Sequence, residues 1–302
     1  MPGCMMDVNS DSQNIAVIGA NGMLAGMIRE RAPKNCTLHL FDLPGFNMTD
    51  CSQVSDVLGA LSPDLIINCA AFTNVDGAET EQELAMAVNG VAVGHLAKVA
   101  LEVDAILVHI STDYVFDGQQ STPYVETDAP NPQSVYGRTK LAGEEAIVES
   151  GLDKYYIIRT SWLYGPDGNN FVETVLRLAT EREEMWIVAD QVGTPTHTGD
   201  LADAVFALLN SCADYGVYHF ADEGQCSWYD FACAIVTEGR GFGLPLKVRE
   251  IHPITTEDYP LPAKRPVNSV FDKGKYKAAT GLNIPGWRAS LHRYFPQREI
   301  KS

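Results

Sequence analysis

The chain has 302 residues, of which 45% are hydrophobic and 20% are charged, and its formal net charge is −17. This length exceeds that of one typical domain, and the composition is that of a globular protein. The negative charge excludes nucleic acid and anionic membrane as expected partners, because both bind basic surfaces, and no apolar run approaches the length of a membrane span.

The first thirteen residues are polar and lack the basic and apolar regions of a signal peptide, so residues 1–13 are expected to be a disordered tail. The seven cysteines are an odd number without a Cys-x-x-Cys pair, and the seven histidines show no metal-binding spacing. We therefore expect free thiols, no metal site and a cytoplasmic location.

A glycine-rich turn follows the first predicted strand. Residues 14–18 (NIAVI) are typical of a buried parallel strand, and a helix is predicted over 23–31. Between them lies GANGMLAG (19–26), a Gly-x-x-Gly variant of the dinucleotide fingerprint with Ala25 at the third, packing position and Gly26 next. Backbone N–H groups at such a helix start bind a pyrophosphate, so this segment predicts a nicotinamide dinucleotide cofactor.

Asp42 ends the second predicted strand, residues 37–41, about 20 residues after the glycine turn. A carboxylate at this position hydrogen-bonds a ribose 2′-hydroxyl and repels a 2′-phosphate, which favours NADH over NADPH. Asp42 also opens the sequence Asp-Leu-Pro-Gly, which is good turn chemistry. Both interpretations stay open, with a slight preference for NADH.

Strands and helices alternate as far as residue 165, which predicts an α/β fold with a Rossmann-type, doubly wound parallel sheet. The dinucleotide-binding domain is expected over 14–165, with part of 186–222 added to it. Residues 166–302 are expected to form mainly a smaller, loop-rich and discontinuous substrate-binding domain. The further expected elements are helices at 48–61, 79–101, 132–148, 170–182, 199–212 and 227–238, and strands at 65–68, 105–110, 155–158, 185–189 and 217–221.

Tyr136 and Lys140 lie one turn apart if residues 132–148 are helical. An ammonium close to a phenol lowers the pKa of the phenol, so Tyr136 is expected to exchange a proton near neutral pH. Thr112, at the end of the preceding strand, offers a hydroxyl to the same carbonyl oxygen. Such a trio suits the reversible reduction of a ketone. Parallel strands bind ligands at their carboxyl ends, where Gly19, residues 68–71 and Thr112 all fall.

Several sequence blocks together resemble those of a known family. They run in order over residues 14–295: GANGML (19–24), INCAAFTNVD (67–76), STDYVF (111–116), YGRTKLAGE (136–144), RTSWLY (159–164), GNNF (168–171), DQVGTPT (190–196) and KRPVNS (264–269). The chain resembles the extended short-chain dehydrogenase/reductases and, within them, the dTDP-4-dehydrorhamnose reductases. The STDYVF, RTSW and DQxGxPT blocks are the most specific to this branch.

The resemblance implies NAD(P)H-dependent reduction of the 4-keto group of dTDP-4-dehydro-L-rhamnose to dTDP-L-rhamnose. Tyr136 would protonate the alkoxide, Lys140 would depress its pKa and hold the nicotinamide ribose, and Thr112 would bind the carbonyl. The implied cofactor contacts are Gly19, Asn21, Gly22, Met23, Leu24, Asp42, Ala70, Ala71, Tyr136 and Lys140. The implied substrate contacts are Thr73, Val75, Tyr114, Trp162, Asn170 and Arg265, the last two at the diphosphate.

Other roles remain open for some of these residues. Tyr114 and Trp162 could pack at an interface, Arg265 could be a surface residue, and Thr73 could cap the following turn. Asn68 is expected to cap the end of its strand. Some relatives dimerise through a metal held by glutamates, one of them early in the first helix, where this chain has residues 26–27 (GM). The expected state is therefore a monomer or a weak homodimer without metal.

The motifs leave two competing functions open. One is a 4-ketoreductase for another nucleotide-deoxysugar, because these motifs do not specify the nucleotide or the ring stereochemistry. The other is a non-catalytic regulatory subunit, since a relative of this branch regulates methionine adenosyltransferase. The complete set of Thr112, Tyr136 and Lys140 favours retained catalysis.

Overall fold

A six-stranded parallel sheet forms the centre of the computed structural model, which describes residues 13–211 and 213–298. The strand order is β10-β5-β4-β3-β1-β2, and every neighbouring pair is parallel. The strands are β1 (Gln13–Ile18), β2 (Cys36–Phe41), β3 (Leu65–Asn68), β4 (Ile106–Thr112), β5 (Tyr155–Thr160) and β10 (Gly216–His219). This confirms the predicted Rossmann-type fold class. The expected tail lies outside the described residues, apart from Gln13, which begins β1.

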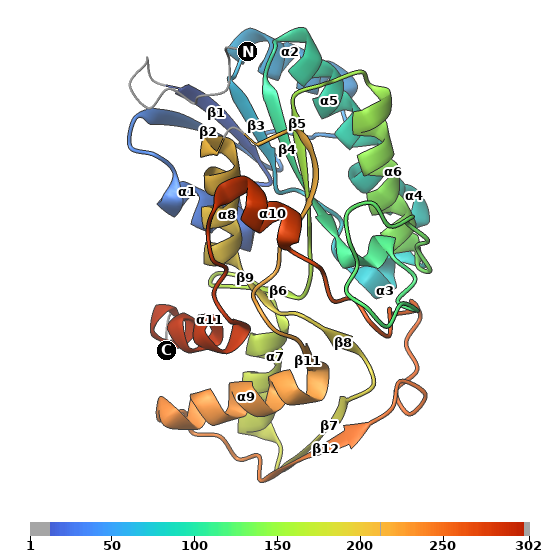
Figure 1. Ribbon diagram of the computed structural model, residues 1–302, viewed down its shortest axis with the longest axis vertical. Helices are drawn as coiled ribbons and strands as arrows, with labels where there is room; N and C mark the ends of the chain where they lie inside the picture. The colour runs from blue at the N-terminus through green and yellow to red at the C-terminus, as the bar shows by residue number, and fades with distance from the viewer. Residues whose placement is uncertain (1–12, 212, 299–302) are drawn as a thin grey trace.

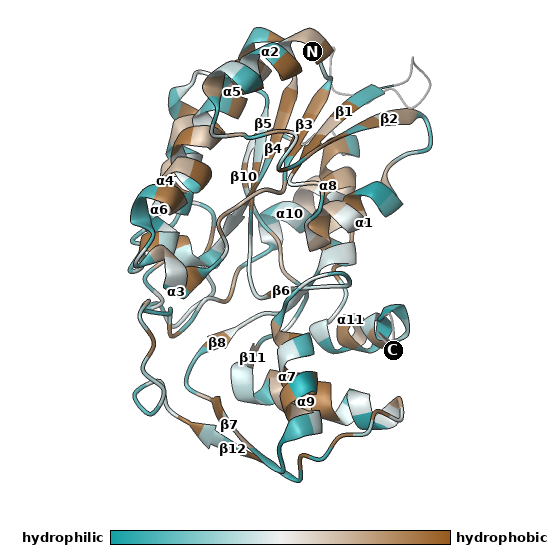
Figure 2. Ribbon diagram, turned by 180° about the vertical axis from the view of Figure 1, so that it is seen from behind, coloured by the Kyte–Doolittle hydropathy of each residue, from teal (hydrophilic) through white to brown (hydrophobic). Residues whose placement is uncertain are grey.

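Helices cover both faces of this sheet (Figure 1). One layer contains α1 (Met23–Arg31), α8 (Thr198–Asn210) and α10 (Gly274–Thr280), and the other contains α2 (Cys51–Leu61), α5 (Ala92–Glu102) and α6 (Val135–Glu149). The strands between the layers are strongly hydrophobic (Figure 2), because a parallel sheet covered on both faces exposes neither set of side chains to water.

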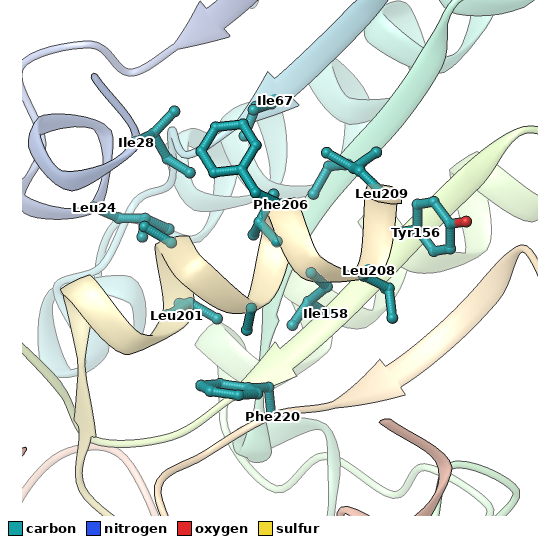
Figure 3. Packing of buried hydrophobic residues seen from close by; sticks show 14 of the residues in the cluster. Leu24, Ile28, Ile67, Tyr156, Ile158, Leu201, Phe206, Leu208, Leu209 and Phe220 are labelled. Carbon is teal, nitrogen blue, oxygen red and sulfur yellow. The ribbon is translucent and has the colours of Figure 1, made fainter. Parts of the chain in front are cut away.

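The layer with α1 and α8 has a core that joins segments far apart in the sequence. Leu201, Phe206 and Leu209 of α8 lie among residues of α1 and of the sheet, including Ile28 and Ile67 (Figure 3). All of these side chains are buried. Burial of each such side chain contributes roughly 1.5–3 kcal/mol, so α8 is an integral part of the first half of the molecule.

One expected helix is interrupted. Instead of a single helix over 79–101, the structure has α3 (Val75–Ala78), α4 (Gln82–Met86), a π-helical turn η1 (Ala87–Val91) and α5. The elements α4, η1 and α5 follow one another without a gap and form one helical stretch, Gln82–Glu102. By length and composition alone this stretch could span a membrane, which corrects the expectation that no run approaches that length. Half of its most apolar window is buried in the protein, as in the core helix of a globular domain.

The remaining elements gather below the sheet in Figure 1 around a separate core that includes Tyr164, Leu176, Phe231 and Leu291. They are the helices α7 (Phe171–Glu181), α9 (Trp228–Gly241) and α11 (Trp287–Tyr294), the strands β6 (Leu163–Tyr164), β7 (Glu184–Val188), β8 (Val192–Gly193), β9 (Thr196–His197), β11 (Cys226–Ser227) and β12 (Glu250–Ile254), and the 3-10 turn η3 (Phe295–Gln297). A second 3-10 turn, η2 (Asp113–Val115), instead follows β4 directly and packs against α6. The division at residue 165, with part of 186–222 returned to the nucleotide domain, stays a prediction.

Candidate active site

A cavity of about 880 Å³ lies at the carboxyl ends of the parallel strands, where α/β sheets bind their ligands. Its wall contains fifteen of the seventeen predicted site residues. These are Gly19, Asn21, Gly22, Met23, Leu24, Asp42, Ala70, Ala71, Thr73, Val75, Thr112, Tyr114, Tyr136, Lys140 and Trp162.

The glycine turn at one end of the cavity suits a pyrophosphate. Gly19 has φ +79°, and a Cβ there would lie 2.7 Å from the Cα of Ala70, so only glycine fits between β1 and β3. Gly22 is the N-cap of α1 and provides no side-chain cap, so the first N–H groups of the helix lack the acceptor that a serine or aspartate would supply. Ala25 is fully buried against the sheet at the packing position. A dinucleotide phosphate fits this donor set.

Asp42 lines the cavity and also orders the turn beside it. Its Oδ2 accepts from the backbone N–H of Asn21 at 2.8 Å, and its Oδ1 accepts from Leu43 N–H at 2.8 Å. The carboxylate therefore joins the β2 turn to the glycine turn, and both interpretations of Asp42 remain compatible with its position.

The serine before α6 places the catalytic candidates. Ser134 caps the helix by accepting from Gly137 N–H at 3.1 Å, which fixes its start just before Tyr136. Tyr136 and Lys140 then lie one turn apart and both face the cavity. Thr112 ends β4 and also lines the cavity, and its hydroxyl donates to Asp113 Oδ1 at 3.0 Å.

The pKa values of this pair differ from the expectation. Desolvation raises the pKa of Tyr136 to about 12, although its hydrogen bond with Thr112 opposes that shift. Burial lowers the pKa of Lys140 to about 8 against the opposing charge of Glu144. The Lys140 Nζ donates to the carbonyl oxygen of Ile110 at 2.6 Å. The predicted lowering of the Tyr136 pKa is therefore wrong, because burial outweighs the other contributions to the pKa at both groups.

The predicted sugar side of the cavity is aromatic. The rings of Tyr114 and Tyr136 meet edge to face at 5.4 Å. Trp162 has the left-handed φ of +48° and stacks on Trp228, with ring centroids 3.5 Å apart. Thr73 lines the cavity but does not cap the next helix, because Asn74 holds that position and accepts from Gly77 N–H.

Asn170 and Arg265, the two diphosphate candidates, do not line the cavity. Asn170 is the N-cap of α7: its Oδ1 accepts from Glu173 N–H, and its Nδ2 donates to the carbonyl of Gly165. Both Arg265 Nη atoms donate to the Asp76 carboxylate at 2.6 Å. Capping and ion pairing occupy these polar groups, so the arrangement gives no support to their predicted role.

Two residues of the cavity wall that bear on its chemistry, Asp113 and Trp228, were not among the predicted site residues. Asp113 lines the cavity, and desolvation raises its pKa to about 6, although its Oδ1 accepts from the Thr112 hydroxyl at 3.0 Å. Its position directly after Thr112 was a signal that could have identified it. Trp228 begins α9, and the sequence carried no signal that places it near Trp162.

Fold and site together define a class of protein, a Rossmann-type nicotinamide-dependent reductase, with a threonine, a tyrosine and a lysine in the wall of one cavity. Comparisons with known proteins then give the family. The family model described as "RmlD substrate binding domain" matches residues 13–299. The chain belongs to this family of dTDP-4-dehydrorhamnose reductases.

Individual relatives agree with this assignment. The dTDP-4-dehydrorhamnose reductase of Escherichia coli K12 is 39% identical over 288 residues, covering 93% of this chain and 96% of the relative. That of Burkholderia thailandensis is 47% identical over 239 residues, covering 76% and 80%. The crystal structure of the Bacillus anthracis enzyme, in complex with NADP, is 39% identical with a TM-score of 0.89, covering 95% of this chain and 99% of that one. The resemblance seen in the sequence is thereby confirmed, and the competing functions gain no support.

Proposed function

We propose that this chain reduces the 4-keto group of dTDP-4-dehydro-L-rhamnose with NAD(P)H and releases dTDP-L-rhamnose. The observation that carries the proposal is the convergence of Thr112, Tyr136 and Lys140 on one cavity. The same cavity contains the glycine turn and the uncapped start of α1. Hydride donor and carbonyl can therefore bind side by side.

The bound nicotinamide supplies the hydride. The Thr112 hydroxyl, which donates to Asp113 Oδ1 at 3.0 Å, would turn to donate to the carbonyl oxygen. Tyr136 gives its proton to that oxygen as the carbon–oxygen π bond becomes a C–H and an O–H bond. Tyr136 is left as a phenolate and regains a proton from water. Reduction needs Tyr136 in its protonated form, which a pKa of about 12 maintains at neutral pH.

The remaining assignments support binding. Gly19, Asn21, Gly22, Met23, Leu24, Asp42, Ala70 and Ala71 would hold the dinucleotide, because they line the end of the cavity nearest the glycine turn. Thr73, Val75, Tyr114 and Trp162 would contact the sugar. Residues 14–165 with part of 186–222 would bind the cofactor, and the rest would close over the substrate. The chain would act in the cytoplasm as a monomer or weak homodimer, without a membrane, nucleic-acid or metal partner.

The test is turnover with dTDP-4-dehydro-L-rhamnose and either NADH or NADPH, followed by the loss of reduced-nicotinamide absorbance. We expect Tyr136→Phe to reduce turnover by roughly 10²–10⁴-fold, since it removes the proton donor, while the Kd for the cofactor stays nearly unchanged. Tyr259→Phe is the matched control, because Tyr259 is 55% exposed and lies outside the cavity wall. Equal turnover in Tyr136→Phe and the control would contradict the proposed role.

Cofactor choice is measured in the same assay. Asp42 predicts a modest preference for NADH, because its carboxylate repels a 2′-phosphate. A clear preference for NADPH would leave Asp42 only its role in the turn.

A further inference from the structure

Lys140 is buried beside a histidine that the reaction described above does not use. Lys140 is 2% exposed and His109 is fully buried on the neighbouring strand β4. The Lys140 Nζ lies 3.2 Å from Nε2 of His109, and it donates to the carbonyl of Ile110 at 2.6 Å. The Lys140 Nζ therefore contacts one carbonyl acceptor and Nε2 of His109. Whether Nε2 carries a hydrogen also depends on what His109 contacts through its other ring nitrogen.

The protonation of His109 is set from the other side of its ring. Asn68, at the end of β3, accepts from the backbone N–H of Ala70 through Oδ1 at 3.1 Å, which orients its amide. Its Nδ2 therefore points to Nδ1 of His109, 3.0 Å away, as a donor. Nδ1 must accept, and a neutral imidazole then carries its hydrogen on Nε2.

This hydrogen points at Lys140. An ammonium has three donors and no lone pair, so it cannot accept from Nε2–H, whereas an uncharged amine can. Charging His109 instead would place a second cation in a fully buried position beside the lysine, and burial and Lys140 hold the pKa of His109 well below its ordinary value.

The carboxylate of Glu144, the other charged group near Lys140, does not reverse this preference for an uncharged amine. Glu144, one turn further along α6, attracts the ammonium form. Its carboxylate is already bound by Arg159, with Nη2 to Oε2 at 2.6 Å, and by the hydroxyl of Ser111. Glu144 is therefore largely neutralised by a partner of its own.

We infer that His109 is a positioning residue that disfavours the ammonium form of Lys140, through a hydrogen-bond chain from Ala70 N–H to Asn68, His109 and the lysine amine. Ala70 lines the cavity, so this chain begins in the cavity wall and ends at the proposed catalytic lysine. A lysine that holds its proton less tightly stabilises the Tyr136 phenolate less, which favours the protonated phenol that donates a proton in reduction. That consequence rests on the proposed function, whereas the state of His109 and Lys140 does not.

The test uses the full chain without cofactor or substrate, so its outcome is independent of whether the proposed reaction is right. The nitrogen NMR shifts of His109 distinguish the two tautomers directly. The Nε2–H form is expected in the wild type at neutral pH. The Nδ1–H form, or a charged ring, would overturn the inference even if no variant folds.

Asn68→Asp provides the second arm. The carboxylate keeps the acceptor for Ala70 N–H but replaces the donor to Nδ1 with an acceptor, so the tautomer of His109 should reverse. Nε2 then accepts from Lys140, and the pKa of Lys140, followed by carbon NMR of labelled lysine, should rise by roughly one unit or more. A reversed tautomer with an unchanged Lys140 titration would overturn the inference.

A double-mutant cycle separates this chain from a direct effect of the new charge. His109→Phe removes the link, so Asn68→Asp should shift the titration of Lys140 much less in the His109→Phe background than in the wild type. An equal shift in both backgrounds would show that Asp at position 68 acts through space, and it would also overturn the role of His109.

Discussion

At the scale of single residues, the cavity depends on side chains held in unusual states by their neighbours. Trp162 adopts a left-handed backbone conformation that non-glycine residues rarely occupy. Its ring lies between the Trp228 indole and Gly193, where a Cβ would come within 2.6 Å of it. The cost of this conformation, of the order of 1–3 kcal/mol, is offset by the stacking and burial of the indole.

Removal of the Trp228 ring should therefore weaken sugar binding without affecting the cofactor. For Trp228→Ala we expect the KM for the nucleotide sugar to rise by roughly 2–10-fold, since an aromatic pair contributes about 0.5–1.5 kcal/mol beyond burial. Trp228→Phe should restore most of the affinity. Trp186→Ala is the control because Trp186 is 55% exposed and outside the cavity. An unchanged KM in Trp228→Ala would contradict the predicted contact of Trp162 with the sugar.

At the scale of elements, the turn between β1 and α1 and the strand β10 each depend on one residue. In the turn, Gly19 accommodates both a positive φ and contact with Ala70. In β10, His219 is fully buried.

Gly19→Ala should lower the free energy of unfolding by roughly 1–3 kcal/mol and sharply raise the Kd for NAD(P)H. The added methyl would displace the turn from Ala70 and change the direction of the α1 N–H groups. Gly59→Ala in α2 is the control: no atom lies within 4 Å of the new Cβ, and alanine should stabilise this helix by roughly 0.5–1 kcal/mol. Calorimetry and cofactor titration of both variants measure these effects. Normal cofactor affinity in Gly19→Ala would contradict the phosphate-binding role of the turn.

His219 makes stability depend on pH. Its Nδ1 bonds the carbonyl of Tyr124 at 3.0 Å, and burial and Arg159 lower its pKa from 6.5 to about 3. Between these values the unfolded chain binds the proton and the folded chain does not, so the contribution is complete above pH 6.5 and is lost as the pH falls toward 3.

His219→Asn removes this titration. The stability advantage of the wild type over the variant should shrink by roughly 1–3 kcal/mol between neutral pH and about pH 4. Denaturant unfolding of both proteins across this range measures the difference. A difference that is constant with pH would show that His219 titrates alike in the folded and unfolded chains.

At the scale of the whole molecule, an ion pair joins α3 in the first half of the chain to a segment near its C-terminal end. Asp76 of α3 holds Arg265 through two hydrogen bonds of 2.6 Å and accepts from Ala263 N–H at 3.1 Å. Burial raises the pKa of Tyr114 in the cavity wall, and the nearby charge of Arg265 opposes this shift. The segment near residue 265 is thus fixed to the nucleotide half beside the predicted sugar position.

Asp76→Asn should release this segment, because an amide cannot accept from both Nη atoms of Arg265. Backbone amide exchange over residues 263–268 should accelerate, and the KM for the nucleotide sugar should rise while turnover at saturation changes less. Arg177→Gln is the control, since the Arg177–Glu181 pair lies on the exposed surface of α7 and contributes little. Equal exchange in Asp76→Asn and in the control would refute this role.

The sequence by itself determined the alternation of strands and helices, the parallel sheet, the glycine turn and the Thr112, Tyr136 and Lys140 set. Each of these is encoded locally, by hydrophobic periodicity, by glycine at a positive φ or by one turn of helix. The family resemblance added the predicted cofactor and sugar contacts, most of which line the cavity.

Only the tertiary structure decided the states and partners of these residues. Asn170 became a helix cap and Arg265 an ion-pair partner because groups distant in sequence, or the backbone itself, competed for them. Trp228 reached Trp162 through the packing of α9, and Lys140 met His109 across β4 and α6. Burial raises the pKa of Tyr136 and lowers the pKa of Lys140. Desolvation and long-range contact depend on the folded chain as a whole, so no local pattern could predict them.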